Sequence, residues 1–98
     1  MNPNPLEKDI ENRVVEFAKK EHKMLVYKFT SPARRSVPDR MFITPDGRVF
    51  FIEMKRKGEK PTAAQAVEQD KIRAMKIPVY VVDNVETGKK VVSLEAMV

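Results

Sequence analysis

A buried-strand pattern with charges inside it is the most constraining feature of this chain. Residues 49–54 are apolar apart from Glu53, a composition typical of a β-strand that is buried on both faces. Glu53 and Lys55 are two residues apart, so their side chains leave the same face of such a strand. Burying either charge alone is costly, whereas an opposite charge or a divalent cation offsets that cost. The pattern therefore predicts a charged site inside an apolar sheet.

A second carboxylate is expected to join this site. Asp39 precedes the apolar run of residues 41–43, and the turn sequence Pro45-Asp46-Gly47 follows that run. The turn would fold the two apolar runs into a hairpin and would bring Asp39 beside Glu53. Two carboxylates and Lys55 are then predicted to converge.

These residues resemble a known nuclease motif. Asp39, Glu53 and Lys55 are similar to the PD-(D/E)xK motif of the restriction endonuclease-like superfamily. A Glu-x-Lys tripeptide alone is common on solvated strands, but a longer ordered set resembles the stand-alone viral and bacterial VRR-NUC branch and spans most of the chain. That set consists of residues 31–40, 53–56, 61–65 and 79–83.

The resemblance implies a metal-dependent DNA nuclease, a hydrolase that acts on ester bonds. Asp39 and Glu53 would bind Mg²⁺ or Mn²⁺ together with the carbonyl oxygen of Met54, and Lys55 would assist deprotonation of the attacking water or stabilise the transition state. The chain has no cysteine and a single histidine, so any metal must be held by oxygen, which independently favours Mg²⁺ or Mn²⁺.

The first helix is expected to supply a further acid. Residues 5–22 carry apolar side chains at helical spacing, with Glu7 inside the apolar arc and Glu11 on its flank. The resemblance favours Glu11 as the catalytic acid, acting directly or through water, because the family's helical acid precedes a pattern like that of residues 12–15. In the alternative interpretation both glutamates lie on the helix surface, and Glu7 serves the helix dipole.

Gln65 has two competing roles. It lies three residues after Thr62, the spacing of a capping box at the start of a second helix over residues 62–76. It also shares a helix face with Ile72 and would point toward the sheet. The resemblance favours a catalytic-site role in which Gln65 holds Lys55 or the water. Both roles are expected together only if Thr62 does not need the amide.

Basic residues are expected to contact DNA. The net charge of +5 and the isoelectric point near 9.6 suit a polyanionic partner. Guanidinium groups ahead of Asp39 could bind phosphates in forks, although a solvated basic loop is the alternative. The predicted DNA-binding residues are Arg34, Arg35, Arg40, Arg56 and Lys57.

The predicted fold is a single α/β domain over residues 1–98, a restriction endonuclease-like core with a small mixed β-sheet flanked by helices in the order α-β-β-β-α-β. Strands are expected in residues 24–29, 41–43, 49–54 and 79–82, and the last strand requires a crossover through the second helix. Residues 83–90, with Thr87-Gly88, are interpreted as a polar turn. An apolar tail of unassigned conformation follows.

Chain size and the resemblance together suggest how the domain acts. A domain of 98 residues buries a modest core, so self-association is expected. With the resemblance, this predicts a homodimer that cuts branched DNA at four-way (Holliday) junctions. The alternatives are a monomeric flap or nicking nuclease and a non-catalytic DNA-binding module. No apolar run is long enough to cross a bilayer and no signal peptide is recognisable, which predicts no membrane partner and a cytoplasmic location, in the host cell if the chain is viral.

Overall fold

The computed structural model describes residues 7–31 and 36–97. In these ranges the predicted order α-β-β-β-α-β is confirmed, with one further helix at the end. No helix within them has both the length and the apolarity needed to cross a lipid bilayer. The elements are α1 (Glu7–His22), β1 (Leu25–Lys28), β2 (Arg40–Ile43), β3 (Val49–Met54), α2 (Ala63–Ala74), β4 (Val79–Val82) and α3 (Val85–Met97).

The strands form the expected small mixed sheet, in the order β1-β2-β3-β4. The pairs β1–β2 and β2–β3 are antiparallel, and the β2–β3 hairpin turns at Gly47, whose φ of 88° suits glycine. The β3–β4 pair is parallel, with Glu53 opposite Val81. Parallel neighbours need a crossover connection, and α2 provides it.

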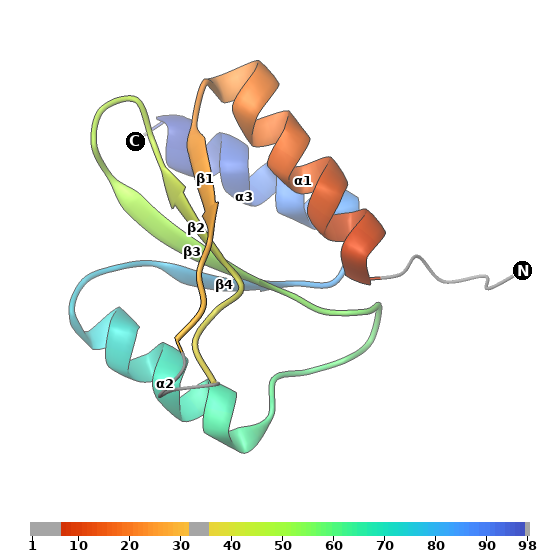
Figure 1. Cartoon of the computed structure of the whole chain (residues 1–98), viewed down its shortest axis with the longest axis vertical. Coiled ribbons are helices and arrows are strands. Elements are labelled where there is room, and N and C mark those ends of the chain that lie inside the picture. The colour runs from red at the N-terminus through yellow and green to blue at the C-terminus, as the bar shows by residue number, and fades with distance from the viewer. Residues whose placement is uncertain (1–6, 32–35, 98) are drawn as a thin grey trace, which may run out of the picture.

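Helices cover both faces of the sheet. Figure 1 shows α1 and α3 together on one side and α2 on the other. The apolar core lies between the sheet and the α1–α3 pair, where the rings of Phe42 and Phe50 stack with centroids 4.9 Å apart. The other fully buried core residues are Ile10, Val14, Ala18, Ile52, Met54, Val82 and Val92.

The turn predicted for residues 83–90 is wrong, because these residues lead into α3. Asn84 Oδ1 accepts a hydrogen bond from the Thr87 N–H at 2.7 Å, as an N-terminal cap does. Gly88 is buried against α1, and a Cβ added there would collide with Val14 Cγ2. Glycine is therefore present because two helices touch, and it does not end a helix.

A polar network fixes the second half of α3 to the β2–β3 hairpin. Arg48 Nη1 donates to Glu95 Oε1 at 3.1 Å, and Arg48 Nη2 donates to the Glu95 carbonyl oxygen. The Tyr80 hydroxyl donates to Glu95 Oε2. Burial, followed by the Glu95 carboxylate, raises the pKa of Tyr80 to about 12. The apolar tail predicted after residue 90 is thus a docked helix.

The end of α2 departs from the usual glycine stop. The helix ends at Ala74, two residues before the predicted end, and Met75 forms its C-cap. Lys76 follows with a φ of 68°, a left-handed conformation that glycine normally supplies. The chain makes this turn with a lysine before Ile77 and Pro78 lead into β4.

Candidate active site

The β2–β3 hairpin brings Asp39 to the end of β3. Arg40 pairs with Ile52, so the residue before Arg40 lies beside the next residues of β3. The Met54 N–H donates to Asp39 Oδ2 at 3.1 Å. Burial raises the pKa of Asp39, although the hydrogen bond from Met54 lowers it. Asp39 is therefore held as a partly desolvated carboxylate next to Glu53.

Glu53 is buried and incompletely satisfied. Its side chain emerges from β3 on the α2 side, and the residue is 2% exposed. Its Oε2 lies 3.5 Å from Lys55 Nζ and 3.4 Å from Gln65 Nε2. Its Oε1 is buried and has no hydrogen-bond partner in the described part of the chain. Burial, and then the charge of Asp39, raises the pKa of Glu53 to about 7.

Gln65 completes the predicted capping box and also contacts Lys55, although Thr62 uses the side-chain amide, contrary to the expected condition. Its Oε1 accepts hydrogen bonds from Lys55 Nζ at 2.9 Å and from the Thr62 N–H at 3.0 Å. The Gln65 N–H in turn donates to Thr62 Oγ1 at 3.1 Å, which completes the capping box. One carbonyl oxygen has two lone pairs and can serve both donors. The start of α2 therefore positions the Lys55 ammonium, and the two roles are not alternatives.

The acids of α1 have different surroundings. Glu11 Oε1 accepts from Arg40 Nε at 3.0 Å and from Arg40 Nη2 at 2.5 Å, so an arginine already holds this carboxylate. Burial raises the pKa of Glu7, and the charge of Asp39 raises it further. Glu7 also contributes to the raised pKa of Glu53. Both acids therefore interact electrostatically with Asp39, and Glu7 also interacts with Glu53. The place of Glu7 inside the apolar arc was the sequence signal for this.

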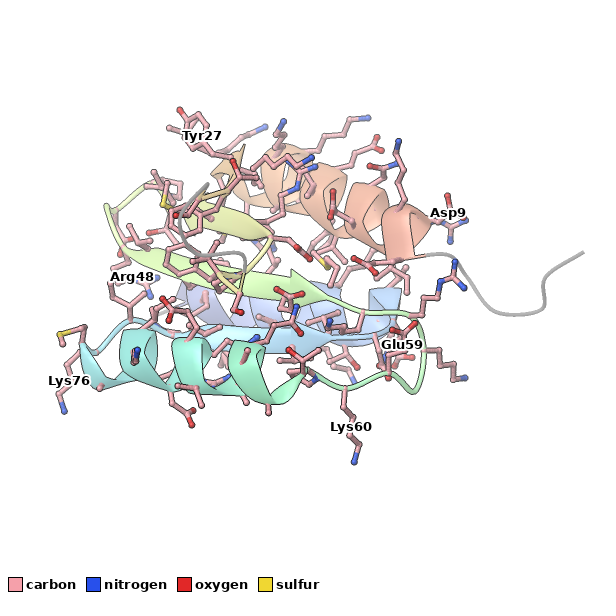
Figure 2. All side chains as sticks on the ribbon, turned by 60° about the horizontal axis from the view of Figure 1, so that its bottom comes forward. Asp9, Tyr27, Arg48, Glu59, Lys60 and Lys76 are labelled. Carbon is pink, nitrogen blue, oxygen red and sulfur yellow. The ribbon has the colours of Figure 1, made fainter. Side chains whose placement is uncertain are left out.

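The predicted DNA-binding residues lie in several places. Arg40 and Arg56 line one groove beside α1. Lys57 is exposed in the turn after β3, where the Gly58 N–H donates to Asp83 Oδ2 at 2.9 Å. Figure 2 shows Glu59 of this connection and Asp9 of α1 at the same end of the molecule, with Lys76 at the opposite end. Arg34 and Arg35 lie outside the described residues.

The donor atoms fit a hard cation. Residues 7–31 and 36–97 contain no group of three or more acidic, histidine or cysteine side chains placed to hold a metal ion. Two carboxylates and a backbone carbonyl, with water at the other positions, suffice for Mg²⁺. In an extended strand the N–H and C=O of one residue leave the same edge, so the Met54 carbonyl faces the side of Asp39. A cation there would satisfy Glu53 Oε1.

Sequence comparison finds a phage relative. No family model matches the chain. A protein of Acyrthosiphon pisum secondary endosymbiont phage 1, named "Putative nuclease p44", is 45% identical over 60 residues. The alignment covers 61% of this chain and 64% of the length of that relative.

Structural comparison extends the likeness to nearly the whole fold. A solved structure of a "VRR_NUC domain" matches with a TM-score of 0.72 and 30% sequence identity. The match covers 86% of this chain and 95% of that domain. With this identity over almost the full length of the domain, and with the predicted hairpin and crossover in place, the chain belongs to the VRR-NUC domain family.

Proposed function

We propose that this protein is a metal-dependent deoxyribonuclease that hydrolyses phosphodiester bonds. The observation that carries the proposal is the buried Oε1 of Glu53, which has no partner among residues 7–31 and 36–97, beside the partly desolvated Asp39. A fold gains no stability from two such carboxylates, whereas a cation that binds a phosphate can use both. The name of the phage relative and membership of the VRR-NUC family support the same activity.

Mg²⁺ or Mn²⁺ would be held by Asp39, Glu53 and the Met54 carbonyl oxygen. When bound, the cation would lower the pKa of a water and neutralise charge on the phosphate oxygens. We place Glu7 as the further carboxylate from α1, in preference to Glu11, because Arg40 already holds Glu11 and because Glu7 interacts electrostatically with both Asp39 and Glu53. Glu11 acts through Arg40 in this proposal.

In this proposal the Lys55 ammonium is the positive charge of the protein that acts on the phosphate, in addition to the cation. Its ammonium group lies between Gln65 Oε1 and Glu53 Oε2, so its direction is fixed before any substrate binds. Donors fixed in this way stabilise charge that develops in the transition state. Either that stabilisation or transfer of the proton from the attacking water would raise the rate. In both roles Gln65 is the residue that holds the lysine.

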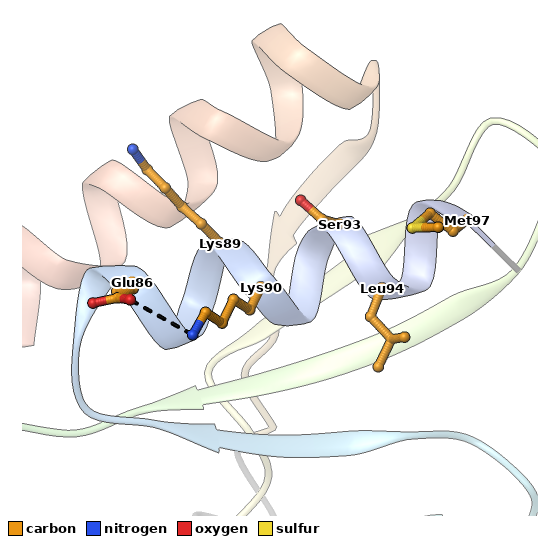
Figure 3. A pocket seen from close by; sticks show the side chains of 6 residues that line it. All are labelled: Glu86, Lys89, Lys90, Ser93, Leu94 and Met97. Atoms are coloured by element: carbon orange, nitrogen blue, oxygen red, sulfur yellow. Dashed lines mark ion pairs between the residues drawn. The ribbon is translucent and has the colours of Figure 1, made fainter.

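We further propose that a homodimer acts on four-way DNA junctions. The apolar residues after position 90 are only partly available for self-association, because they belong to α3 and its Val92 is fully buried. The exposed apolar side chains that support self-association are Leu94 and Met97 beside a pocket of α3 (Figure 3), and Leu25 and Tyr27 on the edge strand β1. Two sites related by a dyad would match the near two-fold symmetry of a junction.

The rival functions differ in measurable ways. A non-catalytic DNA-binding module has no use for buried carboxylates that repel phosphate. A monomeric flap or nicking nuclease would use the same site chemistry, and it would scatter light as a single chain of 11.3 kDa at tens of micromolar. A dimer with about twice that mass and a preference for junctions over linear duplex is the result we expect.

The test is incubation with labelled duplex, flap and four-way junction DNA in Mg²⁺, Mn²⁺ or EDTA. Cleavage in either metal but not in EDTA is expected, with the junction cut fastest. A Glu53→Gln protein provides the matched control, since it keeps the side-chain shape and removes the charge. Absence of cleavage of every substrate in both metals would refute the nuclease assignment.

A further inference from the structure

A charged groove opens beside the proposed metal centre. It has a volume of about 530 Å³ and lies between the first turns of α1, the ends of β1 and β2, and the chain after β3. Four basic side chains face two acidic ones along it. These residues are Lys8, Lys28, Arg40 and Arg56, with Glu7 and Glu11.

Two of these cations are placed directly opposite each other. Lys28 of β1 and Arg40 of β2 are cross-strand partners in the antiparallel ladder. Like charges in this position are destabilising, so the pair lowers the stability of the sheet unless an anion joins it. The Lys28 residue is exposed, and Glu11 accounts for only one of the two charges. With four basic and two acidic lining residues, the groove thus keeps an excess of positive charge that an anion could neutralise.

Glu11 gives Arg40 a fixed direction. The ion pair joins α1 to the sheet, and the Arg40 and Glu11 side chains are only 23% and 18% exposed. The contacts with Glu11 use Nε and Nη2 of the guanidinium. A planar guanidinium held along one edge can present its remaining N–H groups to a phosphate in a defined orientation.

The groove adjoins the site. Two of its lining residues, Arg40 and Arg56, directly follow Asp39 and Lys55 in the chain, and Glu7, which also lines it, interacts electrostatically with Asp39 and Lys55. A DNA strand carries one phosphate per nucleotide, so a strand with one phosphate at Asp39 and Glu53 brings neighbouring phosphates into the adjoining groove.

We infer that this groove binds the sugar–phosphate backbone of the DNA strand next to the bond that is cut, with Lys8, Lys28 and the Glu11-held Arg40 as its contacts. The inference rests on the proposed function, because that function identifies the bound strand as the DNA strand that is cut. Contacts to phosphate fix register and carry no sequence information, so Arg40 is a positioning residue of the reaction. Arg56 extends the same track beyond β3.

DNA binding without metal tests the groove by itself. Fluorescence anisotropy of a labelled duplex in EDTA, across a salt series, gives the slope of log K against log salt. Removing one phosphate contact lowers that slope by about 1. Lys28→Gln should therefore weaken binding and reduce the slope, and Lys8→Gln/Lys28→Gln should reduce it by about 2. Lys76→Gln, at the opposite end of the molecule, removes the same charge and should leave the slope unchanged.

Testing the Glu11–Arg40 pair requires a variant that still folds. Glu11→Gln/Arg40→Gln leaves no unpaired buried charge, and a wild-type melting temperature would establish that it is folded. In Mg²⁺ or Mn²⁺, this variant should raise KM by a larger factor than it lowers kcat, whereas a purely structural role would leave the KM of the folded protein unchanged.

The outcomes separate the groove from the nuclease. Wild-type salt slopes in Lys28→Gln and Lys8→Gln/Lys28→Gln, with an unchanged KM in folded Glu11→Gln/Arg40→Gln, from a protein that still cuts DNA, would overturn the groove and leave the proposed function standing. A wild-type protein that cuts nothing, while Lys28→Gln still lowers the slope, would overturn the proposed function and keep the groove as a DNA-binding surface.

Discussion

Two buried glutamates show how differently this fold treats a charge. Glu95 is 7% exposed, and Arg48 and Tyr80 satisfy both of its carboxylate oxygens. Glu53 is 2% exposed, but its Oε1 has no hydrogen-bond partner among the described residues. The fold can therefore satisfy a buried carboxylate completely where the carboxylate only holds elements together. The unpaired oxygen of Glu53 is therefore available to a ligand from outside the described residues, such as the proposed cation.

Removing a charge at the proposed site should have the largest effect on DNA cleavage, and it should distinguish Glu53 from Glu95. Glu53→Gln, Asp39→Asn and Lys55→Met are each expected to lower the rate of DNA cleavage by about a thousandfold, because each removes a charge that acts on the phosphate. Glu95→Gln should cleave at close to the wild-type rate. Near wild-type cleavage by any of the first three variants would mean that the side chain it changes does not act in cleavage.

Metal binding should stabilise only proteins with an intact Glu53. A cation that binds the folded state alone adds about 2.7 kcal/mol at one hundred times its dissociation constant, so Mn²⁺ should raise the melting temperature of the wild type. Thermal unfolding with and without Mn²⁺ should show this rise in Glu95→Gln and its absence in Glu53→Gln. A wild-type melting curve indifferent to millimolar Mn²⁺ would mean that Asp39 and Glu53 do not share a cation.

For the free energy of unfolding, the ranking of the two variants should reverse: Glu95→Gln should lose more stability than Glu53→Gln. Glu95→Gln removes the buried one of the two carboxylates that pair with Arg48, the other being Asp46, and we expect the free energy of unfolding to fall by about 2 kcal/mol. In EDTA, Glu53→Gln should be as stable as the wild type or more stable at neutral pH, since it removes a desolvated charge. Urea unfolding of the two variants at equal pH measures this. Equal losses in both would place Glu53 among the structural groups.

The pH dependence of the metal-free protein sharpens the same point. The pKa of Glu53 is raised from 4.5 to about 7, so between these values the folded state holds a proton that the unfolded state has released. Stability contributed by this group therefore falls as pH rises through that window. Urea unfolding in EDTA at pH 5 and pH 7.5 should show the decline in the wild type and a smaller one in Glu53→Gln. Saturating Mn²⁺ should remove it.

The sequence predicts that Asp39, Glu53 and Lys55 converge because the contacts that bring them together are short in sequence. The Pro45-Asp46-Gly47 turn and the flanking apolar runs are sufficient to pair β2 with β3, which places Asp39 beside Glu53. The capping spacing of Thr62 likewise predicts where α2 begins and, with it, the direction of Gln65. Local patterns determine these positions.

The failures come from contacts between distant segments. Gly88 suggests a turn, and only its contact with Val14 of α1 explains a glycine inside α3. The capping residue Asn84 was the signal for that helix. A helical wheel likewise does not show that Arg40, which lies 29 positions away, pairs with Glu11.

The hydrogen bonds that assemble the centre join residues 10, 12 and 15 positions apart along the segment from Asp39 to Gln65. Loops of that length close at a small entropic penalty and favour early formation during folding. The contacts that dock the terminal helices span much longer loops, as between Arg48 and Glu95. The contacts among Asp39, Met54, Lys55, Gln65 and Glu53 thus lie within one contiguous stretch of the chain. Insertions before β1 or between α2 and β4 would leave the spacing of that stretch unchanged.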